Sequence, residues 1–170
     1  INNNLLFGFH RLAINGLDEV SNQPLTIENI TLICNGEIYN YKDLYNVYHF
    51  EPKTNSDCEV IIHMYKKYGI EFTLRELDGV FAFLLWDNEK KILHCARDPL
   101  GVRPMYILED DDTIAFGSEI KVLNNLKKNF TINHFEPGTF SCYHLNETVD
   151  KNENNTRNTS FFSNDYQSYK

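Results

Sequence analysis

The segment GVFAFLLWD, residues 79–87, decides the fold class of this 170-residue chain. Every position from Val80 to Trp86 is apolar, so a strand built from it has no face suited to water. A strand that is apolar on both faces is typical of a sheet covered by another layer on each side. The segment therefore predicts a central strand of a layered domain, and its apolar run of seven residues is too short to span a bilayer.

Outward from this segment, strand and helix patterns follow one another in groups. Apolar, β-rich stretches predict strands at 5–14, 29–34, 90–98, 103–110, 113–118 and 136–145. Helical patterns occupy 41–48, 56–69 and 118–128. In the second helix, Ser56 and Glu59 form the Ser-x-x-Glu pattern of a capping box, and Gly69 is a stop signal; Ser118 is the expected cap of the third. Because strands dominate, we expect an α+β domain with helices outside antiparallel sheets.

Composition sets the domain organisation and excludes several partners. The chain is 42% hydrophobic and 14% aromatic, which suits one globular domain with a sizeable core. A net charge of −8 argues against nucleic acid or an anionic membrane as the partner. Residues 146–170 are poor in apolar residues and rich in Asn, Ser and Thr, so we expect a polar linker or disordered tail after a domain at 1–145.

The cysteines indicate the redox setting. Cys34, Cys58, Cys95 and Cys142 lie in or beside apolar segments, and no two form a Cys-x-x-Cys pair. Such spacing favours buried free thiols over a zinc site or a disulfide framework. We therefore expect a reducing, cytoplasmic location.

Familiar catalytic motifs are missing, and polar residues at strand ends remain. The sequence holds no glycine-rich phosphate loop, no HExxH and no GxSxG. Arg11 follows the first apolar run, Asn35-Gly36-Glu37 follows the second, and Asp57 opens the helix at 56–69. Taken singly, these residues are read as a surface cation, a turn and a partner of the helix dipole.

Taken together, they suit one free amino acid. Arg11 can bind an α-carboxylate through two parallel hydrogen bonds, while Glu37 and Asp57 can hold an α-ammonium group. The Asn35 amide and the Gly36 backbone N–H can converge on a tetrahedral oxyanion, where one donor typically lowers the barrier by roughly 3–4 kcal/mol.

Six motifs in a fixed order carry a family resemblance. They are HRLAI at 10–14, NGEIYN at 35–40, SDCEVI at 56–61, LDGVFAF at 77–83, RDPLGVRPMY at 97–106 and GSEIK at 117–121. In these, the chain resembles the N-terminal glutaminase domain of glutamine-hydrolysing asparagine synthetases over roughly residues 5–145. The resemblance implies an N-terminal-nucleophile hydrolase fold, a four-layer αββα sandwich, here lacking its first strand.

The resemblance also implies a reaction. L-Glutamine is hydrolysed to glutamate and ammonia without a cofactor, and the ammonia passes to a C-terminal synthetase domain that uses ATP and Mg²⁺ to amidate aspartate. By this resemblance, the residues that bind glutamine are Arg11, Ile14, Asn15, Asn35, Gly36, Glu37 and Asp57, and Asn35 and Gly36 form the oxyanion hole. Arg97, Asp98 and Arg103 match a family motif that we interpret as structural.

The chain departs from the family at its nucleophile. The family uses an N-terminal cysteine whose own α-amine is the base, whereas this chain starts at Ile1. Cys34 and Cys58 are internal and lack that amine, so we expect the chain as it stands to be inactive. The pyrophosphate-binding SGGxDS loop of a synthetase domain is also missing.

Three interpretations stay open at this stage. The chain is part of a full asparagine synthetase; or it is a truncated relative that binds glutamine or serves as a regulatory or interaction module; or it belongs to another class II amidotransferase, because RDPLGVRP fits a sister enzyme as well. An exposed sheet edge would allow a homodimer.

Overall fold

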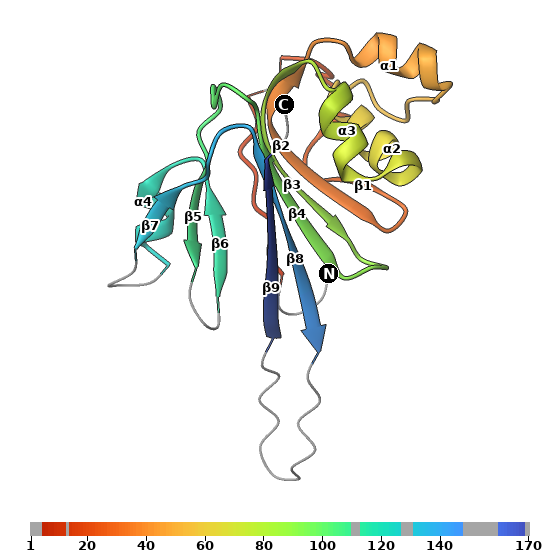
Figure 1. The fold of residues 1–170 in the computed structure, drawn as a ribbon. Helices are drawn as coiled ribbons and strands as arrows, with labels where there is room; N and C mark the ends of the chain where they lie inside the picture. The colour runs from red at the N-terminus through yellow and green to blue at the C-terminus, as the bar shows by residue number, and fades with distance from the viewer. Residues whose placement is uncertain (1–4, 13, 110–112, 127–130, 148–159, 169–170) are drawn as a thin grey trace.

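A computed structural model describes residues 5–12, 14–109, 113–126, 131–147 and 160–168 (Figure 1). Nine strands form two antiparallel sheets within these residues. The larger sheet has the order β1-β2-β3-β4-β8-β9 and the smaller one β6-β5-β7. The strands are β1 Leu25–Ile27, β2 Ile30–Ile38, β3 Gly79–Asp87, β4 Ile92–Arg97, β5 Tyr106–Glu109, β6 Ile114–Gly117, β7 Ile132–His134, β8 Thr139–Glu147 and β9 Ser160–Ser168.

β3 lies between β2 and β4 and serves two cores at once. Phe81, Phe83 and Leu85 belong to a core on the helix side of the sheet. Ala82 and Trp86 alternate with them and belong to a second core, which also holds Met105 and Phe135. The prediction of a strand covered on both faces is confirmed.

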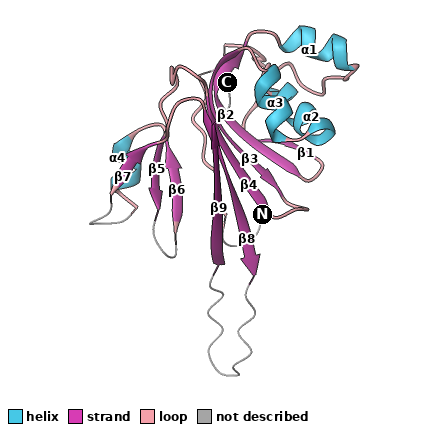
Figure 2. Cartoon of the chain, in the orientation of Figure 1, coloured by secondary structure: helices cyan, strands magenta, loops and turns pink. Residues whose placement is uncertain are grey.

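The helices form the outer layers. Three helices, α1 Tyr41–Tyr48, α2 Glu59–Tyr68 and α3 Ile70–Glu76, cover one face of the larger sheet (Figure 2). The short α4, Ile120–Asn124, contacts β5, β6 and β7 of the smaller sheet. A 3-10 turn, η1 Glu19–Ser21, precedes β1. The order helices, sheet, sheet, helix is the predicted four-layer α+β sandwich.

Two local predictions at the site are wrong. Residues 5–12 run without a strand partner: Leu5 and Phe7 pack against the inter-sheet core, whereas Leu6 and Leu12 are exposed. The apolar, β-rich character of this segment therefore does not make it a strand. Asn35-Gly36 is also not a turn, because β2 continues through both residues to Ile38.

The predicted capping box does not form. α2 begins at Glu59 after Cys58, with no side-chain cap. The Glu59 carboxylate instead accepts the backbone N–H groups of Lys53 and Thr54, at 2.7 and 2.6 Å, and contacts His63 at 2.8 Å. A loop that folds back onto the helix start thus outcompetes the local cap. Gly69, with φ of 80°, ends the helix as predicted.

The remaining differences lie at α4 and at the C-terminal end. α4 follows Glu119 and has no side-chain cap from Ser118. Residues 160–168 are not an unstructured tail, because they form β9 and pair with β8 along its length. Backbone pairing at a sheet edge needs no apolar composition, which is why composition missed it. Residues 148–159 lie outside the described part of the chain.

Across the described ranges, the structure contains no helix of sufficient length and apolarity to span a bilayer.

Candidate functional site

The candidate site lies along the part of β2 that β1 does not cover. β1 pairs only with Ile30 to Leu32. Beyond Leu32, side chains form hydrogen bonds with the free backbone edge of β2. Gln23 accepts the backbone N–H of Cys34 at 2.6 Å and donates to its carbonyl at 3.0 Å. Asp57 accepts the N–H of Ile38 at 2.7 Å. Two side chains therefore replace the missing backbone partner.

Gly36 lies between these two capped positions. Backbone N–H groups of alternate residues in a strand point to the same edge, so the N–H of Gly36 faces the edge that Cys34 and Ile38 also face. No described residue accepts a hydrogen bond from it at this edge. The residue must be glycine, because an added Cβ would lie 2.3 Å from the Val80 carbonyl oxygen.

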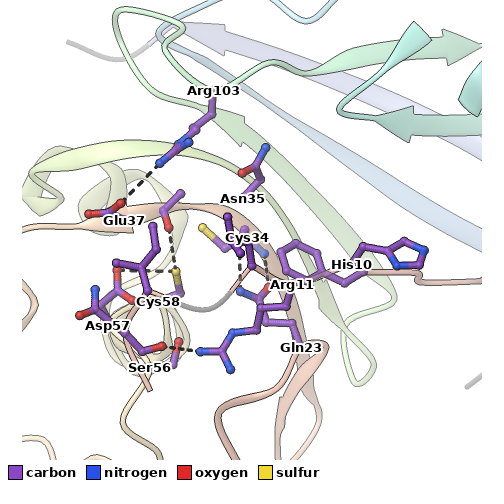
Figure 3. A pocket seen from close by; sticks show the side chains of 15 residues that line it. His10, Arg11, Gln23, Cys34, Asn35, Glu37, Ser56, Asp57, Cys58 and Arg103 are labelled. Carbon is purple, nitrogen blue, oxygen red and sulfur yellow. Dashed lines mark hydrogen bonds and ion pairs between the residues drawn. The ribbon is translucent and has the colours of Figure 1, made fainter. Parts of the chain in front are cut away.

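A pocket of about 240 Å³ opens at this edge (Figure 3). It is smaller than the roughly 300–1,000 Å³ usual for drug-sized ligands, in keeping with a single amino acid. All seven predicted site residues line it. The lining residues are Phe9, His10, Arg11, Leu12, Ile14, Asn15, Gln23, Cys34, Asn35, Gly36, Glu37, Ser56, Asp57, Cys58 and Arg103.

Arg11 is held by the loop that follows it. Its guanidinium donates to the carbonyls of Asn15 and Gly16, the latter at 2.6 Å, and to Asn22 Oδ1 at 3.2 Å. A guanidinium has five N–H donors, so within the described residues two remain for a ligand. The Asn15 carbonyl is already used by Arg11, and Ile14 is 61% exposed at the pocket rim.

The two carboxylates are placed differently. Asp57 is only 5% exposed and uses one oxygen on Ile38, which leaves its other oxygen without a partner among the described residues. Glu37 is half-buried and pairs with Arg103, with 3.6 Å between Oε1 and Nη2. The Asn35 side-chain amide likewise has no partner in the described part of the chain.

Arg103 is a pocket residue that the sequence interpretation missed. Asp98 accepts the backbone N–H groups of Leu100, Val102 and Arg103, at 3.0–3.1 Å. Arg97 donates to the carbonyls of Gly101 and Arg103, both at 2.8 Å. Arg97 and Asp98 are structural, as predicted, but the loop they build presents Arg103 to the pocket. No local pattern shows which strand such a loop faces.

Two thiols form part of the pocket floor. A hydrogen bond to the Cys34 thiol, together with burial, raises the pKa of Cys58 well above its usual range. The nearby Asp57 acts in the same direction, and Arg11 only partly opposes it. Cys58 is therefore a protonated thiol and a poor nucleophile at neutral pH.

The charges of the arginine and carboxylate side chains in the pocket sum to zero. Arg11 and Arg103 carry positive charge, and Glu37 and Asp57 carry negative charge. Such a site matches a zwitterion, which brings one charge of each sign. Among the described residues, no cluster of three or more His, Cys, Asp or Glu side chains is placed to hold a metal ion.

Solved structures place the fold in a class. The allosteric regulatory enzyme of purine biosynthesis matches with a TM-score of 0.63 and 26% identity, over 72% of this chain and 29% of that one. Glutamine phosphoribosylpyrophosphate amidotransferase from B. subtilis, complexed with ADP and GMP, matches with a TM-score of 0.64 and 23% identity, over 84% and 31%. The chain has the N-terminal-nucleophile hydrolase fold that these two structures share.

Sequence comparison narrows the class to a family. The glutamine amidotransferase domain pattern matches residues 1–164, and the chain belongs to this family. Glutamine-hydrolysing asparagine synthetases of Bos taurus and Gallus gallus are each 42% identical to it over 151 residues, and that of Homo sapiens is 40% identical. These matches cover 84% of this chain, but the chain spans only 27% of the length of these relatives.

Proposed function

We propose that the pocket at the β2 edge binds L-glutamine and that the chain is the glutaminase domain of an asparagine synthetase. One observation carries the proposal: two arginines and two carboxylates surround the free edge of β2 at Gly36, in a pocket the size of one amino acid. The relatives' names support the choice of glutamine and of the asparagine branch.

Each predicted residue has a distinct task in this proposal. One spare N–H donor of Arg11 binds the α-carboxylate, and Asp57, helped by Glu37, holds the α-ammonium. The side-chain amide of glutamine then extends toward Asn35 and Gly36. Their amide and backbone donors stabilise the oxyanion formed when its carbonyl is attacked. Ile14 and Asn15 close the pocket rim.

In the parent enzyme, the released ammonia would serve a C-terminal synthetase domain. ATP and Mg²⁺ belong to that domain, and the glutaminase domain needs no cofactor. We also propose a cytoplasmic location for the parent enzyme. We further propose that it forms a homodimer.

The Cys58 thiol in the pocket is not activated. The raised pKa of Cys58 leaves this thiol unsuited to attack glutamine at neutral pH. This observation favours a second function for the 170-residue chain itself: glutamine binding without hydrolysis. We expect it to release no ammonia from glutamine, and ammonia release abolished by C58S would contradict this expectation.

Thermal unfolding with glutamine tests the binding site. Ligand at about 100 times its dissociation constant should stabilise the chain by about 2.7 kcal/mol. Asp57→Asn keeps an acceptor for Ile38 but removes the charge, and loss of a buried charge partner typically costs about 2–5 kcal/mol. We therefore expect glutamine to bind about 100-fold more weakly.

Asp78→Asn is the matched control, because it is the same change at an exposed position directly before β3. It should leave glutamine affinity unaltered. A folded wild-type chain that gains no stability from millimolar glutamine, or an Asp57→Asn chain that binds it normally, would refute the assignment.

A further inference from the structure

Cys34 and Cys58 approach each other in the pocket, although they come from different elements. Cys34 lies in β2 and Cys58 directly precedes α2, and each is 2% exposed. Both cysteines line the same pocket and belong to the same buried core. The Cys58 sulfur also lies 3.9 Å from the Gly36 carbonyl oxygen and 3.9 Å from Asp57 Oδ2 (Figure 3). The thiol pair thus adjoins both the expected oxyanion donor and the expected ammonium partner.

We propose that Cys34 and Cys58 are a covalent modification site at which a small peroxide closes a disulfide and thereby blocks the glutamine pocket. The second half of this proposal rests on the proposed function, whereas disulfide formation does not. Neither thiol has a task in the proposed binding of glutamine, because charged groups and amides hold the ligand.

The reaction balances with the peroxide as the two-electron oxidant. One thiol attacks the peroxide, an S–O bond forms, the O–O bond breaks and water leaves. The second thiol then attacks the sulfenic sulfur, the S–S bond forms, the S–O bond breaks and a second water leaves. Because Cys58 is protonated at neutral pH, we expect this reaction to be slow.

Closure should move Cys58 rather than Cys34. The backbone of Cys34 is fixed on one side by Gln23 and on the other by β3, where it is paired with Phe83. Cys58 directly precedes α2, and Asp57 is the residue before it in the sequence. A shift of Cys58 toward Cys34, along β2, would therefore draw the Asp57 carboxylate away from Ile38 and remove the ammonium partner.

The test treats the reduced chain with hydrogen peroxide, blocks remaining thiols with N-ethylmaleimide and digests with trypsin without reductant. Cys34 and Cys58 lie in the tryptic peptides 12–42 and 54–66, whereas Cys95 and Cys142 lie in 92–97 and 129–151. We expect a disulfide-linked 12–42/54–66 species. We also expect the stabilisation by glutamine to disappear on oxidation and to return with dithiothreitol.

C34S should abolish both the linked species and the peroxide sensitivity of glutamine binding. C142S is the control, because Cys142 lies on β8 beside His94 of β4 and does not line the pocket. This variant should behave as wild type. If C34S does not fold, peptide mapping of the wild type decides. Recovery of 12–42 and 54–66 as separately alkylated peptides overturns the proposal. A linked species in a chain that never bound glutamine refutes the proposed function and leaves the thiol site standing.

Discussion

Two polar regions of the larger sheet differ in how fully their hydrogen bonds are used. One is the pocket at the edge of β2. The other is a buried network below α2, formed by Tyr65, Asp87 and His94. The Tyr65 hydroxyl donates to Asp87 at 2.8 Å and contacts His94 Nε2 at 3.2 Å, and Asp87 also accepts backbone N–H groups from Glu89 and Lys90.

The network fixes its own protonation pattern. A tyrosine hydroxyl has one proton, and Tyr65 gives it to the Asp87 carboxylate. His94 Nε2 must therefore carry hydrogen and donate to Tyr65, which leaves Nδ1 as the acceptor facing Cys142 Sγ at 3.0 Å. The described contacts leave no capacity for a ligand.

The pocket is the opposite case. Arg11, Asp57, Asn35 and the Gly36 N–H each retain a donor or acceptor that the described chain does not use. These groups line an open pocket, so a ligand can use the donors and acceptors that remain. The comparison teaches that the Tyr65–Asp87–His94 network uses its polar groups within the fold, whereas the pocket keeps polar groups available for a ligand. Changes in the pocket should alter binding, and changes in the network should alter stability.

Gly36→Ala should give the largest effect on stability. It should break the separation between binding and stability, because a change in the pocket then alters both. The new Cβ would lie 2.3 Å from the Val80 carbonyl oxygen and 2.7 Å from Phe81 Cα, both backbone atoms of β3. Overpacking typically costs about 1–3 kcal/mol and occasionally more, and here backbone must move. We expect a loss of at least about 3 kcal/mol in urea unfolding, together with loss of glutamine binding.

Gly8→Ala is the matched control, because apart from its two chain neighbours no described residue has an atom within 4 Å of the added Cβ. It should unfold like the wild type. A Gly36→Ala chain of normal stability would show that β2 and β3 can separate here without cost.

The pH dependence of stability sharpens the comparison on the network side. Burial lowers the pKa of His94 to about 4, with Lys90 and His144 acting in the same direction and Asp87 opposing them. An exposed histidine has a pKa of about 6.5, so between these values the unfolded chain binds the extra proton. The free energy of unfolding should therefore fall as pH drops from about 6.5 to about 4, by up to about 3 kcal/mol.

His94→Gln should flatten this slope, whatever its effect on stability at neutral pH. Urea unfolding at several pH values measures it, and glutamine affinity at pH 7 should stay unchanged. If His94→Gln retains the wild-type slope, a group other than His94 takes up the proton on unfolding.

Arg103→Gln should have the smallest effect and sharpen the comparison on the pocket side. Its contact with Glu37 is partly exposed, and such pairs typically contribute about 0.2–1 kcal/mol. Without Arg103, the three remaining pocket charges sum to −1, which disfavours a zwitterion relative to a cation. We expect glutamine affinity to fall by up to about fivefold, while the α-amide of glutamine, a cation, gains relative to it.

Calorimetric titration of both ligands gives this ratio of affinities. An unchanged ratio would show that Arg103 does not set the charge preference of the pocket. Arg75→Gln is a suitable control, since Arg75 forms an exposed pair with Glu71 on α3.

Much of the fold and of the site was predictable because it depends on residue type and short spacing. The apolar run at 79–87 identified the covered strand, and the motifs brought Arg11, Gly36 and Asp57 into one expected site, where the structure places them together. The part they play with glutamine stays a prediction. Sequence patterns failed where a distant partner decided: Glu59 capped a loop instead of its helix, and β8 paired a polar segment as β9.

By itself, the sequence determined the layered α+β class, the strands β2 and β3, the helix α2 with its stop at Gly69, and the residues that carry charge near the site. Only the tertiary structure decided that Asn35-Gly36 lies inside a strand, that Gln23 and Asp57 replace a backbone partner, and that Arg103 faces Glu37. The physical reason is range. Propensity and periodicity act between neighbours in the chain, whereas strand register and the direction of a loop depend on contacts between residues far apart in sequence.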